Sequence, residues 1–262
     1  MAEAAFADWI GRSVETTDIA SGAALRRLAA TLDRPPPEHV VPLLGHWLFH
    51  LPDARQSALG SDGHPAKGGF LPPIAQPRRM WAGGRLRFLA PIRIGARLVK
   101  RTTIIGIVDK GAMTFVTLLH VIAADGEDAI VEEQDLVFLP IAPPAPPKPI
   151  ERPTPDSTRE MIADETMIFR FSALTFNAHR IHYDLPYAQE IEQYPALVVH
   201  GPLQAMLLIG AAQDDGLVPS AFSFRGRSPL YAGRAFTVSR AGHALWVRDA
   251  SDAVTMTAEV TA

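Results

Sequence analysis

Polar side chains that can move protons gather in one stretch of the sequence, shortly before an apolar segment. The stretch contains one asparagine and three histidines, namely Asn177, His179, His182 and His200, and it leads directly into Gly201 and Pro202. Proline suits the first turn of a helix because it has no N–H to leave unpaired, so a helix is predicted to begin at these two residues. Free N–H groups at a helix start attract negative charge. A base beside such a helix end is the minimum equipment for chemistry next to a carbonyl.

Other chemistries fit this stretch less well. His179, His182 and His200 could be gathered around a metal, but H-x-x-H without a neighbouring glutamate lacks the spacing of a zincin, and we expect no metal. Asp184 precedes Leu185 and Pro186 and is expected to cap a helix or turn there. The chain has no Walker A loop, no dinucleotide-binding fingerprint and no G-x-S-x-G elbow.

A second feature is a one-sided block of charge. Residues 63–108 contain nine Lys and Arg residues and no Asp or Glu. Two interpretations remain open: solvated strand faces whose charges cancel across a sheet, or a site for an anionic ligand. For the second interpretation the best candidates are Arg78 and Arg79, which stand just ahead of Trp81.

The composition narrows the class of protein. The chain has 262 residues, 47% of them apolar, a formal net charge of −3 and no cysteine. The chain therefore has enough apolar residues to bury a substantial core. Thiol chemistry is excluded, and binding of nucleic acid over the whole surface is not expected. The first residues do not form a secretory signal, and no apolar run approaches the roughly 18 residues of a membrane span. We expect a cytoplasmic protein that contacts neither membrane nor nucleic acid.

The elements that must position the motif form two similar halves. Residues 141–156 are rich in proline and should run as an extended tether, so we divide the chain into 1–140, a linker at 141–160, and 161–262. An Arg-Pro-Gly pattern at Arg87, Pro91 and Gly95 recurs 138 residues later, which indicates duplication. Each half is predicted to contain an apolar helix, at 203–212 in the second half and at 23–32 or 42–51 in the first. Alternating strands follow each helix, which predicts an α+β fold with a sheet wrapped around a helix.

The pattern N-x-H-R-I-H-Y-D at 177–184, followed by V-V-H-G-P-L-Q at 198–204, resembles the MaoC-like hot-dog hydratases. The resemblance is to the branch of hydroxyacyl-thioester dehydratase type 2 and mesaconyl-C4-CoA (3-methylfumaryl-CoA) hydratase. The stretches 77–88 and 223–234 also look like that branch. The resemblance implies a double hot-dog fold, with the catalytic motif in the C-terminal half and an N-terminal half that accommodates substrate. It implies no cofactor, since CoA is part of the substrate.

The same resemblance implies roles for individual residues. In the simpler members the motif is D-x-N-P-x-H-x-D, and alignment places His182 on the catalytic histidine and Asn177 on the catalytic aspartate. We therefore expect His182 to act as the base for water, Asn177 to orient that water, and the Gly201 N–H to bind the thioester oxygen. Arg78, Arg79, Trp81, His179 and His200 are the candidates for substrate contact, and His200 should shape the turn by bonding backbone.

The implied activity is that of a lyase, the reversible hydration of a short, branched or dicarboxylic enoyl-CoA. Two alternatives remain open. The first is an acyl-CoA thioesterase of the same fold, although the segment 203–212 carries no carboxylate. The second is a non-catalytic acyl-CoA-binding subunit, which the asparagine at position 177 keeps open. Fold analogy also leads us to expect exposed sheet edges through which two copies could pair as a homodimer.

Overall fold

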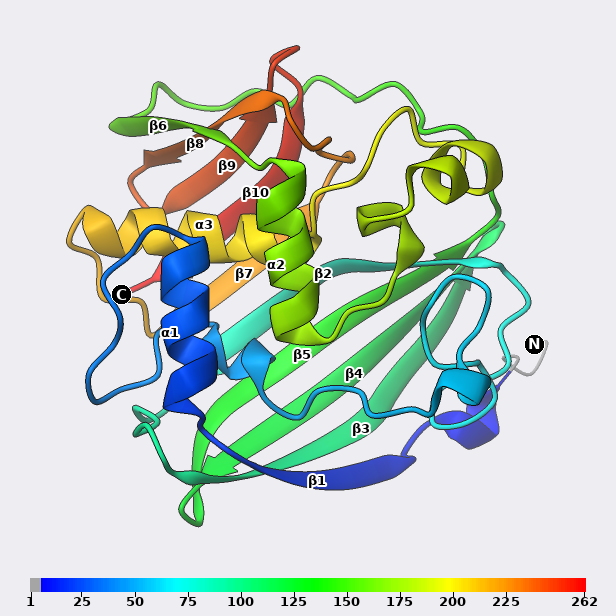
Figure 1. The fold of residues 1–262 in the computed structure, drawn as a ribbon, viewed down its shortest axis with the longest axis horizontal. Helices are drawn as coiled ribbons and strands as arrows, with labels where there is room; N and C mark the ends of the chain where they lie inside the picture. Colours follow the sequence, from blue (N-terminus) through cyan, green and yellow to red (C-terminus); the bar gives the residue numbers. More distant parts are fainter. Residues whose placement is uncertain (1–5) are drawn as a thin grey trace.

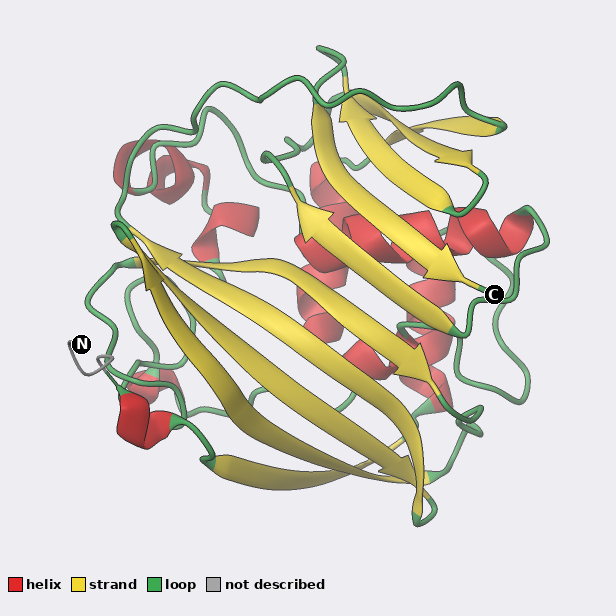
Figure 2. Ribbon diagram, turned by 180° about the vertical axis from the view of Figure 1, so that it is seen from behind, coloured by secondary structure: helices red, strands yellow, loops and turns green. Residues whose placement is uncertain are grey.

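The protein is built on one curved antiparallel sheet that carries its helices on the concave side (Figures 1 and 2). A computed structural model describes residues 6–262. The strand order is β1-β3-β4-β5-β2-β7-β10-β9-β8-β6, so each half contributes five neighbouring strands. The N-terminal strands are β1 (Ser13–Ile19), β2 (Arg78–Phe88), β3 (Arg97–Lys110), β4 (Met113–Ala124) and β5 (Glu127–Leu139). The C-terminal strands are β6 (Ser157–Ile162), β7 (Ala221–Gly226), β8 (Ala235–Ala241), β9 (Ala244–Asp249) and β10 (Val254–Thr261).

The helix predicted at 203–212 is present and is enclosed by the C-terminal strands. It is α3 (Gly201–Asp214), and it begins at Gly201 with Pro202 in its first turn, as expected. Every residue from Leu203 to Ala212 is buried, because strands β7 to β10 surround the helix. A helix without a polar face is stable only in such an enclosure. This half confirms the predicted sheet wrapped around a helix.

The N-terminal half departs from its predicted counterpart. Helix α1 (Gly22–Thr31) forms near the first predicted position. The second candidate, residues 42–51, gives only a short 3-10 turn at Gly45–Leu48. Leu44 (φ 65°) and His50 (φ 55°) adopt left-handed backbone conformations there, which interrupt a helix. Helix α2 (Glu165–Thr175) of the other half packs against α1 (Figure 1). That contact was not apparent in the sequence.

The two halves share a seam along which β2 pairs with β7, from Gly83 opposite Arg225 to Arg87 opposite Ala221. A Cβ on Gly83 would lie 2.5 Å from the Phe224 carbonyl oxygen, so this approach of the strands requires glycine. The irregular chain after β5 runs along the C-terminal half (Figure 1) and ends where β6 begins at Ser157, four residues inside the predicted linker. The edge strands are β1 and β6, and pairing of two copies stays a prediction.

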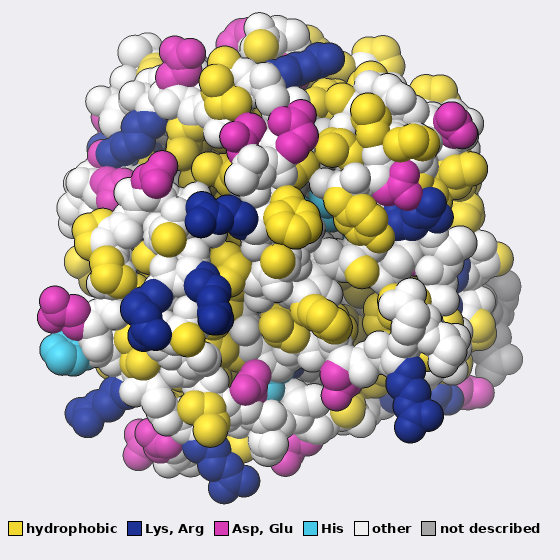
Figure 3. All heavy atoms as spheres, in the orientation of Figure 1, with side chains coloured by type: hydrophobic (Ala, Val, Ile, Leu, Met, Phe, Trp, Pro, Cys, Tyr) yellow, Lys and Arg dark blue, Asp and Glu magenta, His cyan; other side chains and the backbone are white. Residues whose placement is uncertain are grey.

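The block of basic residues at 63–108 finds partners in part across the sheet. Arg85 on β2 forms ion pairs of 2.8 Å with both Glu133 and Asp135 on β5. On the face that carries the helices, side chains of both charge signs are interspersed with hydrophobic ones (Figure 3). None of the helices in residues 6–262 is both long and apolar enough to cross a membrane.

Candidate active site

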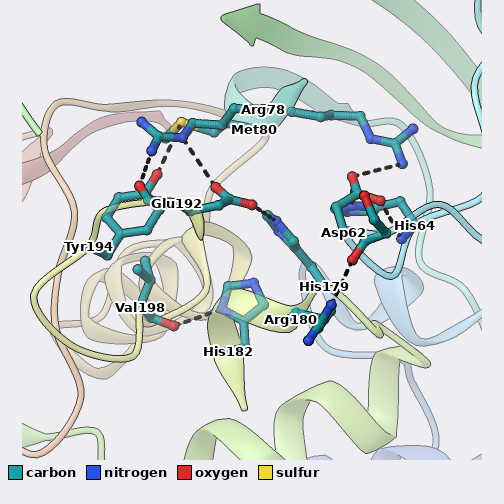
Figure 4. Close-up of polar contacts among 12 residues, drawn as sticks. Asp62, His64, Arg78, Met80, His179, Arg180, His182, Glu192, Tyr194 and Val198 are labelled. Atoms are coloured by element: carbon teal, nitrogen blue, oxygen red, sulfur yellow. Dashed lines mark hydrogen bonds and ion pairs between the residues drawn. The ribbon is translucent and has the colours of Figure 1, made fainter. Parts of the chain in front are cut away.

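The side chain of His182 is buried, and one of its two ring nitrogens is held by the backbone. Nδ1 lies 2.7 Å from the carbonyl oxygen of Val198 (Figure 4). A carbonyl oxygen can only accept, so Nδ1 carries the proton and Nε2 keeps its lone pair. Nε2 forms no hydrogen bond with any residue in 6–262, and the ring lies on the wall of a cavity of about 1330 Å³. The site therefore presents a neutral imidazole with a free acceptor.

Gly201, the first residue of α3, lines the same cavity. Its N–H has no partner inside the helix, because the first N–H groups of a helix never do. Positive potential at the helix start adds to the effect of this donor. A Cβ at this position would meet nothing closer than 3.8 Å. A larger residue would therefore fit at this position. The absence of a side chain leaves the backbone N–H open to a ligand.

The sequence motif brings three imidazole rings together. The ring of His200 stacks on that of His182 with 3.6 Å between centroids, and His179 lies edge-on at 5.5 Å. The expectation that His200 bonds backbone is wrong: its Nε2 lies 2.8 Å from the hydroxyl of Ser172 on α2. His200 does not line the cavity but lies behind His182, so it supports that ring rather than reaching substrate.

Burial keeps the rings of His182 and His200 neutral. Burial lowers the pKa of His182 well below its usual 6.5, and the neighbouring His200 and His179 lower it further. Burial likewise lowers the pKa of His200 to about 3. Both rings are therefore unprotonated at neutral pH. Within residues 6–262 no three His, Asp or Glu side chains are arranged to hold a metal ion.

A buried ion pair fixes His179 from the other side. Its Nε2 lies 3.1 Å from Oε1 of Glu192, and Oε2 of Glu192 accepts from Nε of Arg78 at 3.2 Å (Figure 4). Arg78 also donates to the backbone oxygens of Glu192 and Ala142 and stacks over the ring of Tyr194. Its guanidinium is 4% exposed and does not line the cavity. The structure thus places Arg78 in the support of the motif, away from the cavity where a substrate contact was predicted.

Arg79 and Trp81, the other predicted contacts on β2, do line the cavity. Arg79 is only partly paired: it donates to the Pro65 carbonyl at 3.3 Å, and its nearest carboxylate, Asp62, is 3.9 Å away. Its Nε is buried without a partner among the described residues. Trp81 donates its indole N–H to the Gly83 carbonyl at 2.9 Å, so it offers its ring rather than a donor.

Asn177 lies where the cavity meets a second one of about 880 Å³, and it lines both. Its Oδ1 accepts the N–H of His179 at 2.9 Å, which closes a turn that sets up the motif. The amide NH₂ has no partner in residues 6–262 and is left for a ligand. Asp184 takes the predicted capping role: it accepts the N–H of Tyr187 at 3.1 Å and pairs with Arg180 at 2.6 Å.

The N-terminal half contributes a histidine that the sequence analysis did not single out. His64 lines both cavities, and its Nδ1 lies 3.0 Å from Oδ2 of Asp62. Its ring centroid is 4.3 Å from that of His179 (Figure 4). Burial lowers the pKa of His64 to about 4, against the opposing effect of Asp62. The site therefore holds a second neutral imidazole, oriented by a carboxylate, on a loop of the other half.

That loop is hydrogen-bonded directly to the segment that carries His179 and His182. The N–H of Arg180 donates to the Asp62 carbonyl at 3.0 Å, and the Arg180 guanidinium donates to Ser61. The next residue of the loop, Gly63 (φ +89°), lies so close to Ala178 that a Cβ on it would be 1.8 Å from the Ala178 carbonyl oxygen. Only glycine permits that contact. The sequence Asp62-Gly63-His64, in which a glycine separates an acid from a histidine, was the signal that could have identified the loop.

The chain is similar in sequence to known hydratases and dehydratases. A family model for hydroxyacyl-thioester dehydratase type 2 matches residues 44–232. The chain is 46% identical over 243 residues to a mesaconyl-C(4)-CoA hydratase of Chloroflexus aurantiacus, an alignment that covers 88% of this chain and 87% of that protein. It is 31% identical over 186 residues to the mitochondrial hydroxyacyl-thioester dehydratase type 2 of Schizosaccharomyces pombe, covering 60% of this chain and 62% of that protein.

Solved structures show the same fold at low sequence identity. HtdX of Mycobacterium tuberculosis superposes with a TM-score of 0.73 at 16% identity, covering 95% of this chain and 99% of that one. Another M. tuberculosis protein, described as having a double hot-dog fold, covers 96% of both chains with a TM-score of 0.54 at 14% identity. The predicted α+β double hot-dog is confirmed. With the family model matched over most of its length, the chain belongs to the hydroxyacyl-thioester dehydratase type 2 family.

Proposed function

We propose that this protein catalyses the reversible addition of water to a 2-enoyl-CoA thioester. One observation carries the proposal: the free Nε2 of a neutral His182 and the N–H at the start of α3 face the same cavity. Hydration needs a base for water and a donor for the charge that forms on the thioester oxygen. This site has both, and the family to which the chain belongs is one of dehydratases.

The reaction follows from these two groups. His182 Nε2 takes a proton from water as the water oxygen bonds to Cβ, and the C=C electron pair moves through Cα to the thioester oxygen. The Gly201 N–H stabilises the resulting enolate. Removal of one such donor typically lowers the rate by about two to three orders of magnitude. The imidazolium then returns its proton to Cα, which restores the neutral enzyme. Because Val198 holds the proton on Nδ1, the ring needs no tautomer change during the cycle.

Asn177 and His64 complete the polar wall. The Asn177 amide orients water without ionising, since its NH₂ can donate while its Oδ1 stays bound to the turn. Asn177 cannot ionise, and His64 provides a second titrating group beside His182. Asp62 is hydrogen-bonded to Nδ1 of His64, so Nε2 of that ring points away from the carboxylate. The second cavity, which shares His64 and Asn177 with the first, gives the acyl group room beyond Cβ.

The substrate class we propose is a short dicarboxylic enoyl-CoA such as mesaconyl-C4-CoA. In that compound the free carboxylate is attached to Cβ, the atom that water attacks, so a cation must lie on the cavity wall near the base. Arg79 fits this role because it lines the cavity beside His64 and because Asp62, at 3.9 Å, is too far away to hold its guanidinium by a hydrogen bond. A guanidinium can bind a carboxylate through two parallel hydrogen bonds.

The test is turnover of crotonyl-CoA, itaconyl-CoA and mesaconyl-C4-CoA, followed by loss of enoyl absorbance and by mass spectrometry of the hydrated product. We expect turnover of at least one, with mesaconyl-C4-CoA preferred, and little activity in His182→Ala. No turnover of any of them by the wild type, with CoA thioesters nevertheless bound, would leave a binding subunit as the function. Release of free thiol in a DTNB assay would instead indicate a thioesterase, which α3 does not favour because its only carboxylate is the terminal Asp214.

The carboxylate assignment has its own test. Arg79→Gln should raise KM for mesaconyl-C4-CoA about 10- to 100-fold, since a charge-assisted hydrogen bond contributes about 1.5–3 kcal/mol and each 1.4 kcal/mol is tenfold. The same variant should change KM for crotonyl-CoA, which has no carboxylate, far less. Equal losses with both substrates would remove Arg79 from this role.

A further inference from the structure

Three arginines gather at one end of the cavity, and none of them forms an ion pair with a carboxylate of residues 6–262, although Glu259 lines the same cavity. Arg152 comes from the chain between the halves, Arg225 lies at the end of β7, and Arg227 follows two residues later. Arg227 donates only to the hydroxyl of Thr257, at 3.0 Å, and Nε of Arg152 is buried without a partner in residues 6–262. Burial and the neighbouring Arg225 and Arg152 lower the pKa of Arg227. The cluster therefore presents three guanidinium groups, those of Arg225 and Arg227 exposed, that make no ion pair with a described side chain.

Three other arginines on the same sheet are paired. Arg240 on β8 lies 2.6 Å from Asp215, and Arg248 on β9 lies 2.9 Å from Asp252. Arg85, which also lines the cavity, is engaged by Glu133 and Asp135. Like charges held close together repel and destabilise the fold unless an anion offsets them. The cluster of Arg152, Arg225 and Arg227 thus differs from Arg85, Arg240 and Arg248 in forming no ion pair.

The chain connects this cluster to the catalytic histidine over a short path. Residues 225–230 all line the cavity. The carbonyl of Leu230 accepts the N–H of Val199 at 2.8 Å, and the carbonyl of Val198 accepts from His182. Three residues of extended chain span at most about 11 Å, so Arg227 lies within that distance of the strand contact beside the base. The cavity thus has a catalytic end and a cationic end, joined by one continuous wall.

We propose that Arg152, Arg225 and Arg227 bind the phosphate groups of the CoA handle. This rests on the proposed function, in which the thioester lies at His182 and the pantetheine arm leads away from it. The phosphates of CoA are separated from the thioester by that neutral arm, which matches a cationic end set apart from the base. Guanidinium groups bind phosphate oxygens through charge-assisted, often bidentate hydrogen bonds. Arg79, closer to the motif, is left for the acyl carboxylate.

Calorimetric titration tests the site without relying on turnover. The probes are CoA, 3′-dephospho-CoA and pantetheine, and the variants are Arg152→Gln, Arg225→Gln and Arg227→Gln. Arg248→Gln is the matched control, because Arg248 lies near Arg152 yet is paired and outside the cavity. We expect CoA to bind at least about tenfold more tightly than pantetheine, and each cluster variant to weaken CoA binding about 10- to 100-fold. Added salt should weaken CoA binding in the wild type.

The comparison with 3′-dephospho-CoA separates the two sources of phosphate. Weaker binding of 3′-dephospho-CoA assigns the cluster to the 3′-phosphate, and equal binding assigns it to the diphosphate. If the wild type binds CoA and pantetheine equally, or if Arg248→Gln weakens CoA binding as much as the cluster variants do, the proposal is wrong. Because these titrations need no reaction, loss of the hydratase proposal would show separately, as CoA binding without turnover of crotonyl-CoA, itaconyl-CoA or mesaconyl-C4-CoA.

A kinetic readout links the site to the thioester. Crotonyl-CoA and crotonyl N-acetylcysteamine thioester share the acyl group, but only the first carries phosphates. In Arg225→Gln the ratio of their kcat/KM values should fall about 10- to 100-fold. A variant that had merely lost its fold would lose both activities together and leave the ratio unchanged. An unchanged ratio in a variant whose Tm matches the wild type would overturn the proposal.

Discussion

Replacing His182 with alanine tests the chemistry most directly. The substitution removes the only ring whose Nδ1 is held by Val198 and whose Nε2 is free on the cavity wall. Loss of a positioned base typically costs about 10²- to 10⁴-fold in rate, which is about 2.7 to 5.4 kcal/mol in transition-state stabilisation at 1.36 kcal/mol per tenfold. The ring borders the cavity, so water can fill the space it leaves. We therefore expect the lower part of this range, about 10²- to 10³-fold in kcat.

The same change has a cost in stability that must be measured separately. The Val198 carbonyl loses its buried donor, which costs about 1–3 kcal/mol, and for a chain of this size each kcal/mol lowers Tm by about 2–4 °C. The assay is kcat and KM for mesaconyl-C4-CoA at 25 °C, beside thermal unfolding. His39→Ala, at a histidine whose side chain is 87% exposed, is the control. A kcat within about threefold of the wild type, together with the expected fall in Tm, would refute the assignment of His182 as the base.

Three further outcomes follow from the geometry. Gly201→Pro should lower kcat about 10²- to 10³-fold because it removes the oxyanion donor. Gly201→Ala keeps the N–H, and its Cβ would meet no atom closer than 3.8 Å, so this variant should keep more activity. Equal kinetics of the two variants would contradict the role of this N–H. Gly63→Ala should lower both Tm and kcat, since its Cβ would collide with the Ala178 carbonyl; a stable, fully active variant would show that the contact is dispensable. The free energy of unfolding should fall as pH drops from about 6.5 to about 4, because the unfolded chain binds protons there while burial lowers the pKa of His64 to about 4 and of His200 to about 3. Tm measured against pH should therefore be flat above pH 6.5, and His200→Gln should reduce the slope below it.

Local pattern was sufficient to predict the parts of the fold that local physics determines. Helix α3 was predictable because a segment apolar on all sides, opened by Gly201 and Pro202, is stable only inside a sheet. The helix predicted at residues 42–51 does not form, because tertiary structure overrides the local pattern there. These residues are apolar enough for a helix, but left-handed conformations at Leu44 and His50, fixed by tertiary packing, interrupt it.

The site was predictable to the extent that it is contiguous in the chain. Arg78 and Arg79 are adjacent in sequence, and both were predicted to contact substrate. Successive side chains of a strand point to opposite faces, so Arg78 enters the ion pair with Glu192 and only Arg79 lines the cavity. The Asp62–Gly63–His64 sequence could have marked this loop as a candidate, but its position beside the motif could not be predicted, because His64 and His179 are more than a hundred positions apart.

The hydrogen-bonded seam between β2 and β7 has a consequence for how this molecule can vary. When a pair of identical subunits makes a sheet, any substitution occurs twice, and a change that helps one copy acts on both. Here the two copies are covalently one chain, so a substitution occurs once. The N-terminal half is thereby free to present the Asp62–His64 loop, while the C-terminal half keeps its own cluster of histidines.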